Sequence, residues 1–401
     1  MEYAYCDHIK NIKPSSIREI LKYAYAHPEV IALSTGSPSN EAVPVEEIHA
    51  ISEHIFKDMP MAGLQYSMTE GYPPLRESTK DRLKKVYGIG RDFDDIIITT
   101  GGQQGLSLAP NVLCNPGDTV ICECPSFVSG INAMRIHNAN VVGIEMDEEG
   151  MILSDLEKAI KTEKNVKLLY VIPTFQNPSG KTMSLERRKA IYKLCLENNI
   201  VILEDNPYAE LRFRGEDVPT FKSMDDAGIV IYNGSYSKVL SAGMRVGFIM
   251  AQKDLLNRLT VCKQFSDCHS NIFFQIVCDE WLRKGDVEGH LTRIRKIYGE
   301  RCQFMLDLLD KYIDKRVTWT RPDGGLFLWC TLPEGCDAME LSQIALEKGV
   351  AFVPGSDFMV DSDKPCASFR LNYSTPSYEN MEKGIIRLGE AVTEYLAKKG
   401  L

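Results

Sequence analysis

The 401-residue sequence lacks the features that mark membrane, secreted or nucleic-acid-binding proteins. It has no uninterrupted apolar run near the ~18 residues that a membrane-spanning helix needs. Its N-terminus, MEYAYCDHIKNIK, has no basic region followed by the apolar stretch of a secretory signal. The 46 Lys and Arg are outnumbered by 55 Asp and Glu, and the net charge of -9 disfavours binding to nucleic acid. We therefore expect a cytoplasmic protein that acts on small molecules.

Patterns typical of a metal site are missing as well. The 12 cysteines are scattered without the spacing of a zinc site. His49 and His54 are five residues apart, which is off the i, i+4 spacing that places two ligands on one helical face. We expect reduced thiols in the core and no bound metal.

Seven short runs rich in Val and Ile predict the strands of one sheet. Several are almost continuously apolar, as buried strands of a parallel sheet are, and helical patterns such as residues 184–199 lie between them. This alternation is typical of an α/β fold with a seven-stranded, mostly parallel sheet. The runs are IIITTG (96–101), TVICECP (119–125), NVVGIEM (140–146), KLLYVIPT (167–174), VILEDNP (201–207), IVIYNGS (229–235) and RVGFIMA (245–251).

The length of the chain and a change of pattern near residue 285 predict two domains. A chain of this length exceeds what one compact core usually holds, and two domains leave a cleft between them. We expect a large domain at 41–285 and a smaller α+β domain at 286–401, because a long charged helix and separated strands follow residue 285. Residues 1–40 have too little apolar content for a domain, so we expect them to pack on the cleft and the small domain.

A glycine-rich turn follows the first of these runs. Gly101, Gly102 and Gln103 begin the segment GGQQGL, whose backbone N–H groups can hold a phosphate at the N-terminus of a helix. Such a turn by itself is more often an ordinary connection between a strand and a helix.

Two further segments place polar side chains after apolar strands, where ligands bind in sheets of this kind. Asn177 lies in TFQNPSG, and Asp205 and Tyr208 lie in EDNPY. Burial without a cationic partner would raise the pKa of Asp205, so either solvent or a positive group must face it. The alternative is that Asp205 caps a helix and that Asn177 with Pro178 forms a simple turn.

Lys238 is the strongest single candidate for chemistry. It follows a buried strand in NGSYSKVLSAGMRVGF, close to Ser235 and Arg245. A desolvated lysine beside another cation has a lowered pKa, and its neutral amine can attack a carbonyl group. A Ser-x-x-Lys pattern alone is weak evidence for a catalytic lysine, because it often occurs by chance. The evidence here is the position of Lys238 directly after a buried strand.

Together these candidates match the functional groups of one cofactor, pyridoxal phosphate (PLP). The ordered motifs GGQQGL, CPSF, TFQNPSG, EDNPY, GSYSKVLSAGMRVGF and FRLNYS resemble those of the fold-type I PLP enzymes of the class I/II aminotransferase family. The opening SSIREIL resembles the 2-aminoadipate and kynurenine aminotransferase-like branch. The resemblance covers essentially the whole chain and implies an aspartate aminotransferase-like fold, in which the large domain binds PLP.

The resemblance implies a role for each candidate residue. Lys238 would hold the cofactor, and Asp205 would pair with its pyridine nitrogen. Asn177 and Tyr208 would bond the ring hydroxyl oxygen, with Asn177 also near the substrate. The phosphate would be held by a set of hydroxyl, guanidinium and backbone groups, namely those of Ser235, Arg245, Gly101, Gly102 and Gln103.

Two residues depart from the pattern of the family, and three others extend it. Phe127 stands where a tyrosine commonly stacks on the PLP ring, and Gly102 stands where the branch often has a hydroxyl residue. Arg370, in FRLNYS, matches the arginine that binds the substrate α-carboxylate. Gly36 matches the N-terminal glycine that lies over the substrate. Tyr66 resembles the tyrosine that reaches the phosphate of a neighbouring subunit, which implies a homodimer with shared active sites.

The implied activity is ping-pong transfer of an amino group between an L-amino acid and a 2-oxo acid, with a broad or a 2-aminoadipate, glutamate or aromatic range. Arg18 can pair with the distal carboxylate of an acidic substrate or have only a structural role in a surface helix, and the sequence leaves both open. A PLP-dependent β-eliminating lyase would share Lys238, Asp205 and Arg370, so it is one alternative. An aminotransferase-like regulatory binding protein is the other.

Overall fold

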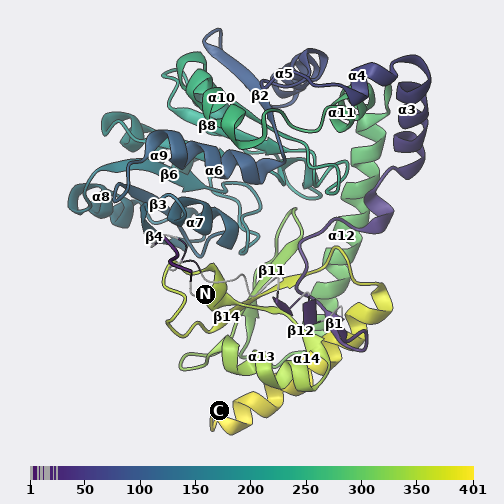
Figure 1. The fold of residues 1–401 in the computed structure, drawn as a ribbon. Helices are drawn as coiled ribbons and strands as arrows, with labels where there is room; N and C mark the ends of the chain where they lie inside the picture. The colour runs from purple at the N-terminus through teal and green to yellow at the C-terminus, as the bar shows by residue number, and fades with distance from the viewer. Residues whose placement is uncertain (1–2, 7–8, 10–11, 13–18, 21, 24–25) are drawn as a thin grey trace.

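The computed structural model of the protein describes residues 3–6, 9, 12, 19–20, 22–23 and 26–401 (Figure 1). Arg18, which the sequence nominates as a contact for acidic substrates, lies outside these residues. Within the described part of the chain, no helix is long and apolar enough to cross a membrane. The same part contains no group of three or more His, Cys, Asp or Glu side chains arranged to hold a metal ion.

The large sheet contains all seven predicted strands. Its order is β2-β9-β8-β7-β6-β3-β4-β5, with β4, β3, β6, β7 and β8 parallel and β9 antiparallel to both of its neighbours. An eighth strand, β5, pairs with β4. With only two residues, β5 is too short to leave a recognisable pattern in the sequence. The strands are β2 (Asp94–Thr99), β3 (Thr119–Cys124), β4 (Asn140–Asp147), β5 (Gly150–Met151), β6 (Val166–Val171), β7 (Val201–Asp205), β8 (Val230–Ser235) and β9 (Gly247–Gln252).

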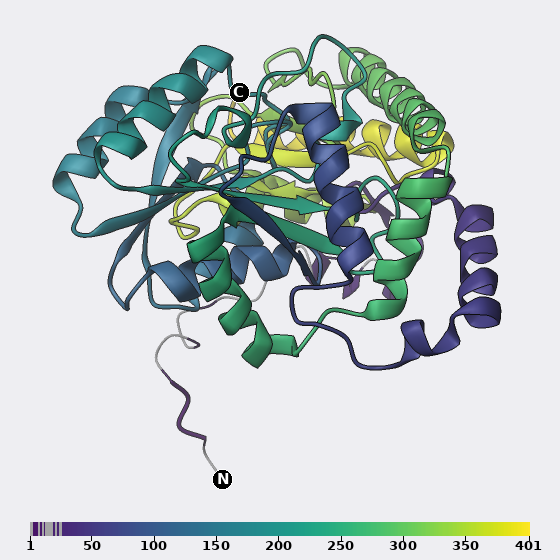
Figure 2. The same ribbon diagram turned by 90° about the horizontal axis from the view of Figure 1, so that it is seen from above.

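Helices cover both faces of this sheet (Figure 2). Successive side chains of β6 point to opposite faces, so Leu169 and Val171 join one apolar cluster with α8 and α9, and Leu168 and Tyr170 join the other with α6 and α7. The helices of this part of the chain, of which α3 and α4 pack on α11, are α3 (Val45–Asp58), α4 (Pro60–Leu64), α5 (Pro73–Tyr87), α6 (Gly102–Leu113), α7 (Val128–Arg135), α8 (Leu153–Thr162), α9 (Leu185–Glu197), α10 (Lys253–Asp267) and α11 (Ile272–Lys284).

The C-terminal region forms an α+β layer around a second, antiparallel sheet of order β10-β11-β14-β13. The N-terminal strand β1 (Ile31–Ala32) pairs with β12, so these two residues lie on this region. The division of the chain at residues 40 and 285 stays a prediction. The elements are α12 (Val287–Tyr312), β10 (Thr318–Trp319), β11 (Phe327–Thr331), α13 (Ala338–Glu347), β12 (Val350–Ala351), β13 (Val353–Pro354), β14 (Ser368–Asn372) and α14 (Tyr378–Lys398).

Candidate active site

A cavity of about 280 Å³ gathers most of the predicted site residues. Its walls come from both sheets, because Asp205 ends β7 and Arg370 lies in β14. Leu106, Pro207, Ser237, Ala242 and Phe327 also line it. The predicted residues that line it are Gly36, Gly102, Gln103, Phe127, Asn177, Asp205, Tyr208, Ser235, Lys238, Arg245 and Arg370.

Asp205 is buried at the carboxyl end of β7. The Tyr170 hydroxyl donates to its Oδ2 over 3.1 Å, and the Asn233 amide donates to its Oδ1 over 2.9 Å. Burial raises the pKa of Asp205 to about 6, although these two hydrogen bonds oppose the rise. Because no cation among the described residues forms an ion pair with Asp205, a cation in the cavity would restore its ordinary ionisation.

Lys238 follows β8, and its Nζ donates to the Gly36 carbonyl oxygen over 2.6 Å. Burial, together with the positive charges of Arg370 and Arg245, lowers the pKa of Lys238 to about 8. A substantial fraction of the amine is therefore uncharged near pH 8. The uncharged amine is the form that attacks a carbonyl group or takes a proton.

Arg370 is a buried cation between aromatic rings. Its guanidinium carbon lies 4.2 Å from the ring centre of Phe327 and 5.0 Å from that of Phe358. Its Nη1 donates to Asn177 Oδ1 over 2.8 Å, and its Nη2 donates to the Ser34 carbonyl oxygen over 2.7 Å. Burial lowers the pKa of Arg370 to about 10. Its Nε has no hydrogen-bond partner among the described residues, so the guanidinium still has a donor for an anionic ligand.

Asn177 links this guanidinium to Tyr208. The Asn177 Nδ2 donates to the Tyr208 hydroxyl over 3.4 Å, while its Oδ1 is taken by Arg370. Burial raises the pKa of Tyr208, so its hydroxyl stays protonated and can donate into the cavity. The amide and the phenol are thus placed together, as the motifs predict.

A further part of the cavity wall brings together hydroxyl, guanidinium and helix N-terminal groups. Gly101 caps α6 with φ +69°, and a Cβ built on it would overlap the Arg245 guanidinium, so only glycine permits this approach. Arg245 Nη1 donates to Ser237 Oγ over 3.4 Å, and Ser235 Oγ lies 3.0 Å from Ser237 Oγ. The first N–H groups of α6 lack helical partners, so this part of the wall is suited to an anion.

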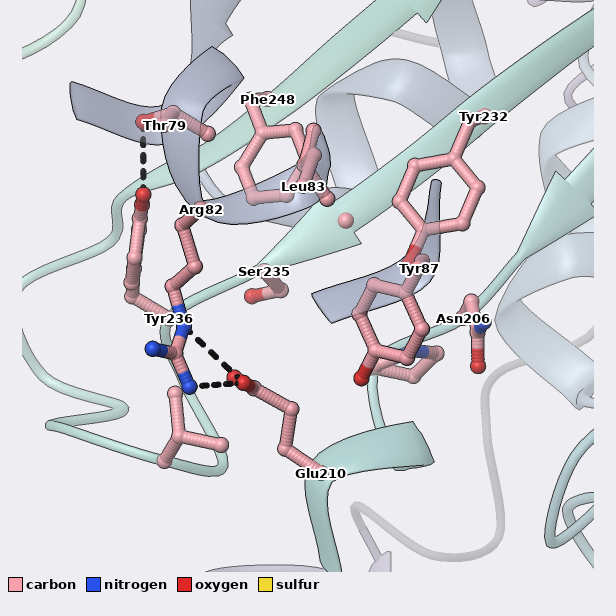
Figure 3. Close-up of a pocket in the computed structure, with 13 residues that line it drawn as sticks. Thr79, Arg82, Leu83, Tyr87, Asn206, Glu210, Tyr232, Ser235, Tyr236 and Phe248 are labelled. Carbon is pink, nitrogen blue, oxygen red and sulfur yellow. Dashed lines mark hydrogen bonds and ion pairs between the residues drawn. The ribbon is translucent and has the colours of Figure 1, made fainter. Parts of the chain in front are cut away.

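A second, smaller cavity of about 40 Å³ shares Pro207 and Ser235 with the first (Figure 3). The Tyr236 hydroxyl lies 2.7 Å from Thr79 Oγ1 of α5 there. The Arg82 guanidinium of α5 forms an ion pair with Glu210, and Figure 3 shows both contacts. Tyr236 lines this second cavity, Ser237 lines the first, and Ser235 between them lines both.

Tyr66 is not brought to this cavity in its own chain. Its side chain is 83% exposed, and its ring meets that of His269 edge-on, with ring centres 5.7 Å apart. Its predicted role in a neighbouring subunit stays a prediction.

Sequence reasoning missed several residues that complete the site. A tyrosine such as Tyr170, in the apolar run LLYVIP, needs a partner for its buried hydroxyl, which is a signal that points to Asp205. Asn233 precedes the recognised GSYSK motif by one residue. The carbonyl oxygen of Ser34, which contacts Arg370, belongs to the backbone and leaves no signal in the sequence.

The residues present fit the groups of PLP. A guanidinium, two hydroxyls and a helix N-terminus gather in one part of the wall for a phosphate. A buried carboxylate without an ion-pair partner among the described residues suits a protonated pyridine nitrogen, and the amide–phenol pair suits the ring oxygen. Phe127 supplies an aromatic wall, and the Lys238 amine lies in the same cavity.

Residues 28–388 match the family described as aminotransferase class I and II. The chain is 38% identical over 391 residues to aromatic-amino-acid aminotransferase 1 of Thermococcus litoralis, covering 96% of this chain and 93% of that protein. It is also 38% identical over 389 residues to the 2-aminoadipate transaminase of Thermus thermophilus, covering 96% of each. Its structure matches that of Pyrococcus horikoshii kynurenine aminotransferase in complex with PMP, with a TM-score of 0.94, 36% identity, and coverage of 98% of this chain and 97% of that one. The chain therefore belongs to the class I and II aminotransferase family and is a PLP-dependent aminotransferase with an aspartate aminotransferase-like fold.

Proposed function

We propose that Lys238 holds PLP covalently in the cavity and that the enzyme transfers amino groups between amino acids and 2-oxo acids there. The observation that carries this proposal is the meeting of Lys238, Asp205 and Arg370 in one cavity, where none of them forms an ion pair among the described residues. When bound, PLP supplies an electron sink for the negative charge that develops at the substrate Cα. Asp205 would keep the pyridine nitrogen protonated, and Asn177 and Tyr208 would bond the ring oxygen.

Lys238 also moves the proton of the reaction. Its pKa of about 8 leaves enough neutral amine to take the proton from the substrate Cα. The resulting ammonium would then act as the acid that delivers this proton to the C4′ carbon of bound PLP. The Gly36 carbonyl oxygen, 2.6 Å from Nζ, gives the amine an acceptor beside the substrate.

Arg370 binds the α-carboxylate of either substrate. Its planar guanidinium can donate two parallel hydrogen bonds to a carboxylate, and burial between two rings strengthens that contact. The bond to Asn177 holds the guanidinium in register with the cofactor ring.

The experiment that tests the proposal follows the absorbance of the PLP-loaded protein. Addition of an amino acid should convert the PLP spectrum to that of pyridoxamine phosphate, and addition of a 2-oxo acid should reverse the change. Borohydride treatment should fix the cofactor to Lys238, as mapped by peptide mass. An adduct on any other lysine, or release of pyruvate and ammonia without a 2-oxo acid, would overturn the proposal.

We propose a broad substrate range that includes aromatic and acidic amino acids. The relatives are named for aromatic amino acids, 2-aminoadipate and kynurenine. The apolar wall formed by Leu106, Phe127 and Phe327 accepts an aromatic side chain. Arg18 is the predicted contact for a distal carboxylate, so Arg18→Ala should weaken kcat/KM for 2-aminoadipate and leave that for phenylalanine within a few-fold. Equal losses would assign Arg18 a structural role.

We propose a homodimer, with Tyr66 of each subunit contacting the phosphate held by the other. Highly exposed apolar side chains support this, because Leu64 is 62%, Tyr66 83% and Phe265 86% exposed. Mixing inactive Lys238→Ala protein with impaired Tyr66→Phe protein should restore part of the activity through hybrid dimers. A fully active monomer would end the idea. The cytoplasmic location stays a prediction.

A further inference from the structure

An ion pair between a buried lysine and a partly exposed aspartate lies next to the turn that begins α6. The side chain of Lys263, in α10, is fully buried, and its Nζ contacts Asp267 Oδ1 over 2.7 Å. Burial lowers the pKa of Lys263. Burial acts to raise the pKa of Asp267, but its hydrogen bonds with Lys263 and Thr100 outweigh this and the pKa is lowered. Lysine is almost never fully buried unless it is paired with an opposite charge. In this pair, Lys263 lowers the pKa of Asp267 and so keeps its carboxylate ionised.

The second oxygen of Asp267 holds Thr100. Thr100 Oγ1 donates to Asp267 Oδ2 over 2.8 Å and lies 2.9 Å from Ser270 Oγ. The Thr100 backbone N–H donates to Gln104 Oε1 over 2.8 Å. Thr100 immediately precedes Gly101, the cap of α6. These bonds therefore fix both the side chain and the backbone of the residue that leads into the turn.

The backbone after Asp267 is unusual. Cys268 has φ +61° and ψ -61°, in a region that is costly for a residue with a side chain. The His269 N–H donates back to the Asp267 carbonyl oxygen over 2.6 Å. This tight turn ends α10 and directs Ser270 toward Thr100. Backbone strain persists only where the surrounding structure fixes it, and it gathers at functional sites.

We infer that Lys263 and Asp267 position the phosphate-binding turn at residues 101–103 through the Thr100 hydroxyl. This inference rests on the proposed function, because it takes the PLP phosphate as the ligand of the turn. Lys263, Asp267 and Thr100 do not line the cavity. They are therefore positioning residues, which act on the cofactor through Gly101 and the start of α6.

The pairing of Asp267 with a lysine has a physical reason. A carboxylate accepts a stronger hydrogen bond than a neutral group does, so it holds Thr100 firmly. An uncompensated carboxylate near a phosphate would weaken phosphate binding by repulsion. Lys263 supplies the opposite charge, so Thr100 gains a charged acceptor without net negative charge beside the turn.

The test compares PLP with pyridoxal, which lacks the phosphate. Thr100→Val removes the hydroxyl while keeping the shape and charge of the side chain, and Thr100→Ser keeps the hydroxyl. Dissociation constants of both ligands are measured by absorbance titration of the full-length protein after removal of the cofactor. We expect Thr100→Val to weaken the binding of PLP about tenfold, which corresponds to the free energy of one such hydrogen bond. The binding of pyridoxal should weaken less than about twofold. Thr100→Ser should bind PLP within about threefold of the original protein.

Controls separate this inference from the proposed function. Asp225→Asn, in a buried ion pair that does not line the cavity, should lower thermal stability without changing the ratio of PLP to pyridoxal affinity. If Thr100→Val leaves that ratio unchanged while Arg245→Leu lowers it, the inference is overturned and the proposed phosphate site stands. If Arg245→Leu also leaves the ratio unchanged, the phosphate is not bound at this turn and both fail. Thr100→Ala repeats the measurement should the valine protein not fold.

Discussion

Two groups of buried charge in this protein are compensated in different ways. Lys222 is fully buried, and its Nζ contacts Asp94 Oδ1 over 2.7 Å and Asp225 Oδ2 over 2.9 Å. In the cavity, Asp205 and Arg370 are also buried, but neither forms an ion pair among the described residues. In the first group, each charged side chain contacts one of opposite charge. In the second group, the charged side chains form hydrogen bonds only with amides, hydroxyls and carbonyl oxygens among the described residues.

The difference shows which of the two groups is built for a ligand. In the cavity, burial pushes each group toward its neutral form, because the pKa of Asp205 rises to about 6, that of Lys238 falls to about 8, and that of Arg370 falls to about 10. A cationic ring nitrogen, an aldehyde and a carboxylate would each complete one of these groups. Groups that are perturbed by burial and gathered in one cavity are typical of an active site.

The largest effect is expected at Lys238. Lys238→Ala removes the proposed covalent anchor and the proposed proton carrier, so we expect turnover to fall by roughly 10²–10⁴-fold or more. Without cofactor, the variant should not be less stable than the unmodified protein near pH 7, because the lowered pKa of Lys238 means that its charged form opposes folding there. Steady-state transamination and thermal unfolding of one preparation measure both. A variant that keeps most of its turnover would refute the role of this lysine.

At Lys222 we expect a large effect on stability, whereas at Lys238 the large effect is on activity. Lys222→Met leaves the buried carboxylates of Asp94 and Asp225 without a cation, so we expect the free energy of unfolding to fall by about 3–5 kcal/mol. Denaturant titration measures this loss. Lys189→Met is the matched control, because its ion pair with Glu186 is exposed and should contribute less than about 1 kcal/mol. Similar losses of unfolding free energy in both variants would show that burial does not determine how much the Lys222 ion pairs stabilise the protein.

The same contrast explains how much of the fold and site could be predicted from the sequence. The seven predicted strands are confirmed, because short runs rich in Val and Ile between turn residues are a local signal of strands. Lys238 and Asp205 could be placed in one cavity because the carboxyl ends of neighbouring parallel strands meet at one edge of the sheet. The roles assigned to them stay proposals.

The rest of the site could not be predicted because it depends on distant contacts. The carbonyl of Ser34 meets Arg370 across 336 residues of sequence, and any residue type could supply that carbonyl. The Lys263–Asp267 pair reads as an ordinary i, i+4 pair on a helix, and only the fold brings Thr100 to it. Contacts of this kind carry no local periodicity or motif.

A smaller effect is expected at Asp205, where substitution should stabilise the protein, whereas substitution of Lys222 should destabilise it. Its pKa in the folded protein, about 6, lies above its ordinary value of 3.8, so its ionisation opposes folding above pH 6 and has no effect below about pH 4. Without cofactor, Asp205→Asn should therefore be more stable than the original protein by about 3 kcal/mol at pH 8, and the advantage should vanish near pH 4. Denaturant titrations at several pH values measure this difference. An advantage that is the same at every pH would assign it to packing rather than to charge.

The smallest effect is expected on the titration of Lys238 when a neighbouring charge is removed. Burial is the main cause of its low pKa, and Arg370 is the next. Arg370→Leu removes that charge and leaves most of the burial, so we expect the pKa of Lys238 to rise from about 8 by up to about one unit. In the protein without cofactor, the rate at which an amine reagent labels Lys238, mapped by peptide mass, should reach half its maximum at a correspondingly higher pH. Arg301→Leu is the control, because this buried arginine contacts the Pro376 carbonyl and Glu41 and does not line the cavity. If both variants titrate as the original protein does, Lys238 does not sense the charge of Arg370 and its low pKa comes from burial and Arg245 alone.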